Sequence, residues 1–517
     1  MLARELPETT ERISGSLLAA LRTPRTAAGL PTAIAALYGL LFALAMWLYP
    51  LMWPQAPIIS SDSGTYLEVS ADLKDFRIDR LHYRPPGYPL FLRLASGGEL
   101  PTRRLFIFSL VLHFASIWGL ASVLQAAGLP RAALGLFGVL LLLPPYVEPA
   151  AYVQSEGFSA FVLVMSFGGI VLWHSRRATI WLVLAALAIG YAGLVRPTYQ
   201  ALGVAVAGGL FVGAKLCLSP PATFKATLRA ATVFASVSAL PIGMYLLLNY
   251  ARFGHVGLSL VSPVDSATLS TRTARVIERL PDEYAAVREV LLSARDADLL
   301  RRHGSHTGYG YLSSPGVTQE LSKVTGLKGP ELARYLVRLN LLLIRKAPLE
   351  YSYDVSRAFC LYWFPSATEV ANFNSRTLQL LWGGVQACVI TVFAATMLVL
   401  VGGIPYFLVY RRRVRQDSST LVDGRAPRRW RSHAYMLAGI IVMYTALISS
   451  ALETGDPRYR VPTDGLIVFM AFLGSDMCRR AILLAGSICA QADLLFRNDA
   501  VHRGAQSDHV DEACGVG

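Results

Sequence analysis

Residues 33–53 read AIAALYGLLFALAMWLYPLMW, and the polar stretch at 57–68 that follows them reads PIISSDSGTYLE. Crossing the hydrocarbon core of a bilayer takes about 20 mostly apolar residues, so 33–53 is predicted to be a membrane-spanning helix. No small-residue cleavage site follows this run, which indicates an uncleaved first span rather than a signal peptide. The polar stretch is therefore expected at the mouth of a membrane bundle.

Similar apolar runs recur along the chain. Further candidate spans lie near 105–125, 132–147, 157–173, 179–195, 199–217, 231–250, 379–409, 435–452 and 464–478, whereas a run at 481–496 is too short and polar to count. Charged residues make up 16% of the chain, against about 25% in soluble proteins. The sequence thus predicts an all-α integral membrane protein, a polytopic bundle of about 10–13 transmembrane helices with helices in its external loops.

The net charge of +14 would suggest nucleic-acid binding in a soluble protein, but its distribution argues against that. Basic residues gather in alternate short loops, namely the N-terminal tail, Arg176–Arg177, 215–229, 411–431 and Arg479–Arg480. By the positive-inside rule these segments are cytoplasmic, and threading the spans in order puts all of them on one side. We expect a multi-pass protein of the bacterial inner (cytoplasmic) membrane, with a cytoplasmic N-terminus, that contacts membrane lipids and no nucleic acid.

This topology places the unusual polar motifs together on the external, periplasmic face. The external segments are 54–104, 146–156, 196–199, 251–378 and 453–462. They come from distant parts of the chain, so one site at which they converge is the economical explanation.

Two acids near the start of the first external loop, Asp62 and Glu68, belong to a helix-start pattern. Thr65 and Glu68 fit the Ser/Thr-x-x-Glu capping box, which predicts a helix from Thr65 to about Leu73 with Asp62 in the turn ahead of it. A turn or capping role is the simpler interpretation of Asp62, and box partner is the simpler interpretation of Glu68. A functional carboxylate at Asp62 is the alternative.

The same loop continues with Arg84-Pro-Pro-Gly-Tyr-Pro. The prolines fix their own backbones and bias Arg84 toward an extended conformation, while Gly87 permits a turn or a close approach. Arg84 could simply reach phospholipid headgroups. A rigidly aimed guanidinium also suits a bidentate contact with one specific phosphate.

Three more ionisable residues lie at helix ends on the predicted external face. Glu148 and Glu156 flank the corner between two spans, and an ionisable residue near membrane depth is a candidate functional residue. Glu156 also falls in the first turn of a helix, where the macrodipole favours an acid regardless of function. Arg196, just before Pro197, either binds a phosphate or anchors its helix at the interface.

A late motif reads Asp456-Pro-Arg-Tyr-Arg-Val-Pro462, in which Arg458 and Arg460 straddle Tyr459. Asp456 can pair with one of these arginines structurally. The other arginine is then left for a substrate.

Three of these features together resemble the GT-C superfamily: the acid followed by Tyr66 in the first loop, the Pro-Pro-Gly-Tyr-Pro turn at 85–89, and the late motif at 456–462. The likeness is greatest to bacterial relatives of protein O-mannosyltransferase and of lipid A aminoarabinose transferase. It covers the span order and is specific in three or four short stretches. Many relatives carry an acidic pair in the first loop, whereas here Asp62 stands beside Ser61 and Ser63, so the second acid is left open.

This resemblance implies a GT-C-like bundle with an external active site that takes a sugar from a polyprenyl-phosphate carrier. It implies that Asp62 is the catalytic carboxylate and that Arg84 contacts the carrier phosphate. An acceptor hydroxyl has a very high pKa and needs a carboxylate to take its proton, so Asp62 as general base with direct attack predicts inversion. Retention would need a covalent intermediate on a carboxylate.

The complete set of candidate residues follows from these motifs. Predicted catalytic residues are Asp62 and Glu156; predicted donor phosphate ligands are Arg84, Arg196, Arg458 and Arg460; predicted substrate-binding residues are Tyr66, Glu68, His82, Tyr88, Glu148 and Tyr459. The sugar and the acceptor, whether lipid, glycan or protein, cannot be derived from these residues.

Neither a zinc site nor a disulfide framework is indicated by the six scattered cysteines. His303 and His306 lie in a Gly-Ser loop without a carboxylate, which is typical of ordinary polar loop residues. We expect no required metal or other cofactor, although some GT-C branches use a divalent metal.

Composition divides the chain into four parts: a catalytic transmembrane module at 1–250, an external cap region with amphipathic helices at 251–378, C-terminal transmembrane helices at 379–496, and a disordered cytoplasmic tail at 497–517. The alternative function is a transporter or flippase of lipid-linked sugars. Transporters tend to show internal repeats and matched broken helices, and the sequence shows neither.

Overall fold

The computed structural model describes residues 32–60, 62–75, 77–78, 80–81, 84–96, 102–176, 178–216, 223–254, 256–258, 272–301, 315–363, 376–417, 430–452 and 457–479. Within these ranges the structure is helical, and the only β feature is an isolated bridge between Ile58 and Tyr152. The all-α prediction is confirmed. His82, the pair His303 and His306, Asp456 and the predicted tail at 497–517 lie outside the described residues.

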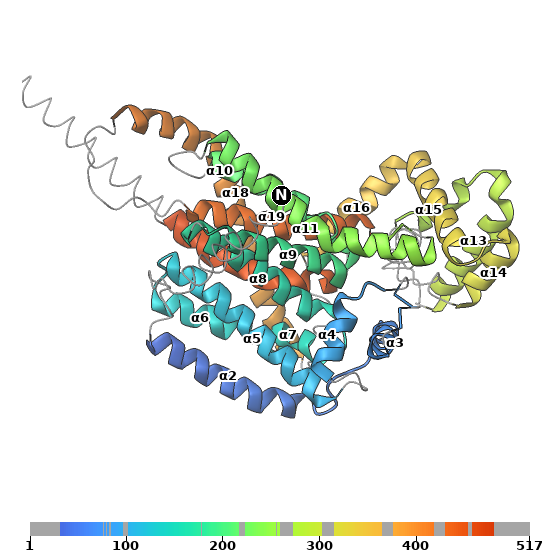
Figure 1. The fold of residues 1–517 in the computed structure, drawn as a ribbon, viewed down its shortest axis with the longest axis horizontal. Coiled ribbons are helices and arrows are strands. Elements are labelled where there is room, and N and C mark those ends of the chain that lie inside the picture. Colours follow the sequence, from blue (N-terminus) through green and yellow to red (C-terminus); the bar gives the residue numbers. More distant parts are fainter. Residues whose placement is uncertain are drawn as a thin grey trace, which may run out of the picture.

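The long apolar helices stack beside one another as a bundle (Figure 1). In chain order they are α2 (Thr32–Met52), α5 (Arg103–Ala126), α6 (Arg131–Leu141), α7 (Pro144–Val147) with the 3-10 turn η1 (Glu148–Ala151), α8 (Ser155–Arg176), α9 (Thr179–Val195), α10 (Leu202–Leu216), α11 (Phe224–Phe253), α18 (Arg376–Asp417), α19 (Trp430–Leu452) and a last helix at 461–479. Each of the ten predicted spans therefore corresponds to a helix or a bent helix pair.

Seven helices of the described chain are long and apolar enough to cross a membrane, or eight if a bent pair counts as one span. The bent pair is Arg131–Leu141 with Pro144–Ala151, which turns by 65°. Two other predicted spans are short, because α9 has 17 residues and α10 has 15. Short and bent helices still fit a bundle when neighbouring helices cover their ends.

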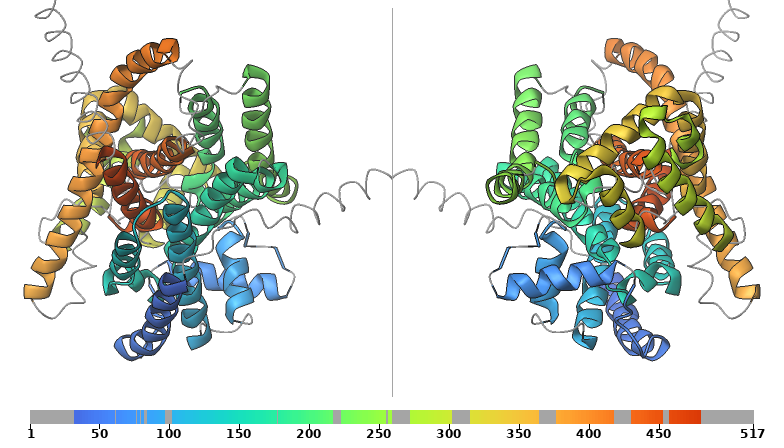
Figure 2. Two further views of the ribbon diagram at one scale, coloured as in Figure 1. Left: turned by 90° about the vertical axis from the view of Figure 1, so that its left-hand side faces the viewer. Right: turned by 90° about the vertical axis from the view of Figure 1, so that its right-hand side faces the viewer.

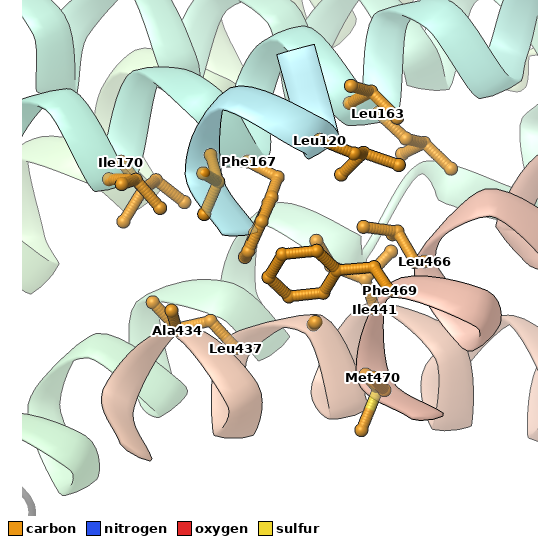
Figure 3. Packing of buried hydrophobic residues seen from close by; sticks show 14 of the residues in the cluster. Leu120, Leu163, Phe167, Ile170, Ala434, Leu437, Ile441, Leu466, Phe469 and Met470 are labelled. Atoms are coloured by element: carbon orange, nitrogen blue, oxygen red, sulfur yellow. The ribbon is translucent and has the colours of Figure 1, made fainter. Parts of the chain in front are cut away.

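The centre of the bundle joins early helices to the last one (Figure 3). Phe167 of α8 meets Phe469 of the last helix edge to face, with ring centroids 5.2 Å apart. Leu120 of α5 and Ile441 of α19 pack into the same buried cluster. This arrangement of aromatic rings is favourable beyond the apolar area that it buries. Early and late helices of the described chain are therefore held in one core.

Helices α9 and α11 cross closely at Gly190. A Cβ on Gly190 would overlap the main-chain oxygen of Ser238, so only glycine fits there. Small residues at such crossings let helix backbones approach one another in a membrane. The crossing fixes the direction of α9, whose C-terminal end carries Arg196 into the site described below.

Shorter helices gather at one end of the bundle (Figures 1 and 2). They are η4 (Ala274–Arg279), η5 (Asp282–Tyr284), α13 (Ala285–Arg301), α14 (Pro315–Thr325), α15 (Gly329–Lys346) and α16 (Pro348–Tyr362), and toward the same end lie α3 (Ser63–Lys74) and α4 (Gly87–Ser96).

The turn η4 and helices α13 to α15 build a small core of their own. Ile277, Leu291, Leu321, Leu336 and Leu339 are buried in it. Leu336 and Leu339 lie on one side of α15, and Pro330 lies in the first turn of this helix. The division of the chain into four parts stays a prediction.

Candidate functional site

The first loop is fastened to the segment that precedes α8. Ile58 and Tyr152 form the isolated parallel bridge. Within it, Ile58 N donates to Ala151 O over 2.7 Å, and Val153 N donates to Ile58 O over 2.9 Å. Farther along the loop, Ser63 Oγ donates to Val153 O over 2.8 Å. These bonds carry the N-terminus of α3 to the start of α8.

Asp62 occupies the N-cap position of α3, but its side chain makes no capping hydrogen bond. Thr65 Oγ1 donates instead to the main-chain oxygen of Asp62 over 3.0 Å. The expectation that a Thr65 and Glu68 capping box starts this helix is wrong, because the helix already begins at Ser63, whose side chain bonds to the segment before α8. The carboxylate of Asp62 is thus left to bind other groups.

Arg84 is the first partner of that carboxylate. Its Nη2 donates to Asp62 Oδ1 over 3.2 Å, and its Nε donates to Thr65 Oγ1 over 3.0 Å. The guanidinium carbon also lies 4.8 Å from the centre of the Tyr66 ring, a cation–π distance. Three contacts therefore hold Arg84 in one orientation.

The corner behind Arg84 is packed against the end of α9. A Cβ on Gly87 would lie 2.6 Å from the main-chain carbon and oxygen of Leu194, so the predicted close approach at this glycine is confirmed. Tyr191 Oη donates to Gly87 O over 2.7 Å. This contact brings the loop of Arg84 next to Arg196, which directly follows α9.

Arg458 bridges the two candidate catalytic acids. It lies in the 3-10 turn η7 (Pro457–Arg460), just ahead of the last helix. Its Nη2 donates to Asp62 Oδ2 over 2.5 Å, and its Nε donates to Glu156 Oε1 over 2.7 Å. Charge-assisted bonds of this length are stronger than neutral ones, so the late motif is firmly joined to the first loop.

Glu156 lies in the first turn of α8, and Arg196 is its second partner. Arg196 Nη1 is 3.1 Å from Glu156 Oε1, and the two side chains are only 8% and 2% exposed. The ring of Tyr459 lies beside both arginines, with its centre 5.1 Å from the guanidinium carbon of Arg196 and 5.6 Å from that of Arg458. A buried carboxylate needs such pairing to stay charged.

Arg84, Asp62, Arg458, Glu156 and Arg196 thus form a chain of alternating charges, called here the arginine–carboxylate network. Three arginines against two carboxylates leave it with a net charge of +1. Burial by itself would raise the pKa of Asp62, but the charges of the three arginines and a hydrogen bond from Arg458 outweigh it and hold the pKa below its ordinary value of 3.8. Asp62 is therefore ionised at neutral pH.

No protein-family model matches the sequence, and no curated protein matches it. Solved structures do. The archaeal oligosaccharyltransferase AglB from Archaeoglobus fulgidus, in complex with an inhibitory peptide and a dolichol-phosphate, is 13% identical, with a TM-score of 0.45 over 87% of this chain and 51% of that chain. The apo form of the Archaeoglobus fulgidus oligosaccharyltransferase is 16% identical, with a TM-score of 0.48 over 88% and 51%. ArnT from Cupriavidus metallidurans in the apo state is 12% identical, with a TM-score of 0.31 over 86% and 76%.

The matching proteins are GT-C glycosyltransferases, the superfamily that the sequence motifs resemble. This chain spans about half the length of the two archaeal chains. Since all three TM-scores lie below 0.5, the similarity gives no residue correspondence. What this chain does has to be inferred from its own residues.

Arg460, predicted to bind a donor phosphate, is turned away from the network. Its Nε donates to Asp464 Oδ1 over 2.7 Å and its Nη1 donates to Tyr362 O over 3.1 Å. Only 1% of the side chain is exposed. A guanidinium that is enclosed and bonded in this way holds helices together, so the structure does not support a phosphate contact at Arg460.

Other predicted substrate-binding residues lie around the network rather than in it. Glu68 points to solvent and pairs with Arg80 Nη1 over 3.3 Å, away from Asp62. Tyr66 lies under Arg84, and the buried Tyr88 packs edge-on against Tyr66 with ring centroids 4.9 Å apart. Tyr66 therefore contacts Arg84 directly, and Tyr88 packs against Tyr66.

Of the remaining predictions, Glu148 is buried at the start of η1, and His82 lies outside the described residues. Where the structure is described, no group of three or more His, Cys, Asp and Glu could hold a metal ion.

The sequence patterns placed Thr65 only in a capping box and did not indicate Ser155. Thr65 anchors Arg84, and Ser155 Oγ accepts a hydrogen bond from Tyr66 Oη over 3.3 Å. Thr65 would have been found if the helix had been started at Ser63, since residues three apart in a first turn are neighbours. No local signal marks Ser155, because its partner lies 89 residues away.

Proposed function

We propose that this chain is a membrane glycosyltransferase that moves a sugar from a polyprenyl-phosphate-linked donor to an acceptor hydroxyl on the periplasmic face of the bacterial inner membrane. The observation that carries this proposal is the arginine–carboxylate network, in which one carboxylate stands between two partly exposed arginines. Acceptor lipids, glycans and proteins all offer the hydroxyl that the reaction needs.

The arginines fit a phosphate. A sugar phosphodiester carries a single negative charge, which matches the net charge of +1 on the network. Arg84 and Arg458 are 20% and 32% exposed, so a ligand can reach both, whereas Arg196 is enclosed and supports them. Donors aimed at the departing phosphate stabilise the charge that it gains in the transition state.

Asp62 is the proposed general base. The acceptor oxygen attacks the anomeric carbon, the bond from that carbon to the phosphate oxygen breaks with its electron pair, and the acceptor proton passes to Asp62. A carboxylate that shares two guanidiniums is a weak base. A donor phosphate competes for the same guanidiniums, so donor binding raises the pKa of Asp62 at the moment when a base is needed. Direct attack inverts the anomeric carbon.

Glu156 receives a different role from the one predicted. Its side chain is 2% exposed and paired with both Arg196 and Arg458, so an acceptor hydroxyl has no access to it. We propose that Glu156 positions the two arginines. A divalent cation does not fit here, because both carboxylates are already neutralised by guanidiniums that would repel it.

The test is sugar transfer from a panel of synthetic polyprenyl-phosphate sugars by purified protein in nanodiscs. Asp62→Asn is compared with Asp75→Asn, a matched change at the other end of α3, where Asp75 is exposed and pairs with Arg77. We expect Asp62→Asn to lower transfer, or slow donor hydrolysis, by about 10²–10⁴-fold while donor binding survives, and Asp75→Asn to have no such effect.

The opposite result is equally clear. If every donor binds but stays intact, and lipid-linked sugar crosses the membrane of a proteoliposome, the chain is a transporter. Asp62 is then a structural residue at the start of α3.

A further inference from the structure

Helix α16 lies against the end of α19 and against the turn η7, which carries Arg458. Tyr351 and Tyr362 stand about three turns apart on α16, which places them on one face roughly 16 Å apart. Tyr351 Oη donates to Ala451 O, at the end of α19, over 3.1 Å. Tyr362 Oη shares a hydrogen bond of 3.2 Å with Thr463 Oγ1, at the start of the last helix. Helix α16 therefore holds both the end of α19 and the start of the last helix.

Arg460 adds a second bond between η7 and the end of α16, because its Nη1 donates to the main-chain oxygen of Tyr362 over 3.1 Å. Arg460 is two residues from Arg458 in the same 3-10 turn. Any shift of the end of α16 is thus transmitted directly to the turn from which Arg458 extends.

Arg272 holds the end of α19. Its Nε donates to Ser450 O over 2.9 Å, in the last turn of α19, and the side chain is buried. The next residue, Thr273, donates from Oγ1 to Asn340 Oδ1 of α15 over 2.8 Å. A cation at a helix C-terminus satisfies carbonyls that have no helical partner. The end of α19 is therefore tied to the group of helices that includes α15 and α16.

The position of η7 matters because Arg458 must reach two carboxylates at once. Its bonds of 2.5 Å to Asp62 and 2.7 Å to Glu156 both depend on where its own backbone stands. A displacement of about 1 Å is enough to lose catalytic geometry.

We propose that α16 fixes the backbone of η7 and thereby orients Arg458. Tyr351 and Arg272 are then positioning residues for the reaction, although neither belongs to the arginine–carboxylate network. This rests on the proposed function, since it assigns a task to Arg458 in that same site. Helix α16 thereby affects the reaction through the backbone of η7, which sets the position of Arg458.

A double-mutant cycle tests the proposal. Tyr351→Phe, Arg458→Ala and the double variant are compared in sugar transfer, with Tyr353→Phe as the control on the exposed side of α16. We expect Tyr351→Phe to lower kcat by about three- to ten-fold, the worth of one neutral hydrogen bond, and to have almost no effect once Arg458 is absent. Arg272→Gln should follow the same pattern. Tyr353→Phe should match the unaltered chain.

A role in folding alone would lower kcat equally with and without Arg458, and that additive result overturns the proposal. Binding of polyprenyl phosphate without a sugar, measured on the unaltered chain, the two single variants and the double variant, supplies a readout that needs no transfer. There too Tyr351→Phe must weaken binding only when Arg458 is present. Absence of transfer by the unaltered chain overturns the proposed function, whereas transfer with additive effects overturns the role of α16.

Discussion

Arg458 donates to Asp62 over 2.5 Å, although the two residues are 396 positions apart in the chain. The bond links the first external loop to the late motif, and Glu156 accepts a second bond from the same guanidinium. Each carboxylate is balanced by arginines from other segments. Removing one member therefore leaves a partner with an unbalanced charge in a half-buried setting.

Arg458→Lys should disable the site without unfolding the chain. Lysine carries a compact charge and cannot bond Asp62 and Glu156 at the two angles that a guanidinium spans. We expect kcat/KM to fall by about 10–100-fold, the worth of one charge-assisted bond, with little change in Tm. Arg479→Lys, at an exposed arginine paired with Asp476, is the control. Arg458→Lys with most of its activity left would contradict the assignment.

Arg460→Gln should lower the stability of the folded protein rather than act directly on the site. The change leaves Asp464 without the cation that now bonds it over 2.7 Å in an enclosed setting. Breaking one side of a buried pair destabilises a protein by about 3–5 kcal/mol, so thermal unfolding in detergent should occur at a clearly lower temperature. A variant that melts normally but binds donor poorly would restore Arg460 as a phosphate ligand.

Gly87→Ala should disturb the corner that holds Arg84. The added Cβ would lie 2.6 Å from main-chain atoms of Leu194, which cannot yield as a flexible side chain would. Overpacking of this kind costs about 1–3 kcal/mol, and we expect transfer to fall with it because the loop of Arg84 must move. Gly64→Ala, in α3 with open space around its Cβ, is the matched control and should be neutral or slightly stabilising.

The depressed pKa of Asp62 predicts how stability depends on pH. Its ion pairs contribute fully above the ordinary value of 3.8, and the contribution is lost as pH falls through the lower value of the folded state. Asp62→Asn should remove this acid-sensitive part of the melting profile, while Asp75→Asn should retain it. Unchanged acid sensitivity in Asp62→Asn would show that the ion pairs do not form in solution.

Kinetics supply a companion measurement. The pH profile of kcat/KM reports Asp62 in the free protein, and that of kcat reports it with donor bound. If the donor phosphate draws guanidiniums away from Asp62, the acid limb of kcat lies at higher pH than that of kcat/KM. Coinciding limbs would mean that Asp62 keeps both arginines throughout the reaction.

Motifs in the sequence were sufficient to name the members of the network as candidate residues, but they did not predict that these residues pair with one another. Asp62, Arg84, Glu156, Arg196 and Arg458 were all candidates, because a polar residue at a helix end beside long apolar runs is conspicuous. Their pairing depends on helix directions that local patterns do not contain. The packing of Gly87 on α9 and the bridge at Ile58 are long-range contacts of this kind.

Two differences between the expectations from sequence and the structure have the same origin. Arg458 and Arg460 are alike in sequence, and only the packing of η7 against Tyr362 decides which of them is enclosed. Glu68 fits a capping box, but Ser63 starts the helix earlier through its bond to Val153, ninety residues away. Local rules were correct about the residue types and failed where a distant segment determined the helix start.

The late position of Arg458 has a consequence for how the protein is made. Synthesis proceeds from the N-terminus, so Asp62, Arg84, Glu156 and Arg196 are all in place before the guanidinium that joins them exists. If the chain is the glycosyltransferase proposed above, a nascent chain that has inserted only its earlier spans lacks one of the three arginines of the site. The arginine–carboxylate network is therefore complete only when the helix at 461–479 enters the bilayer.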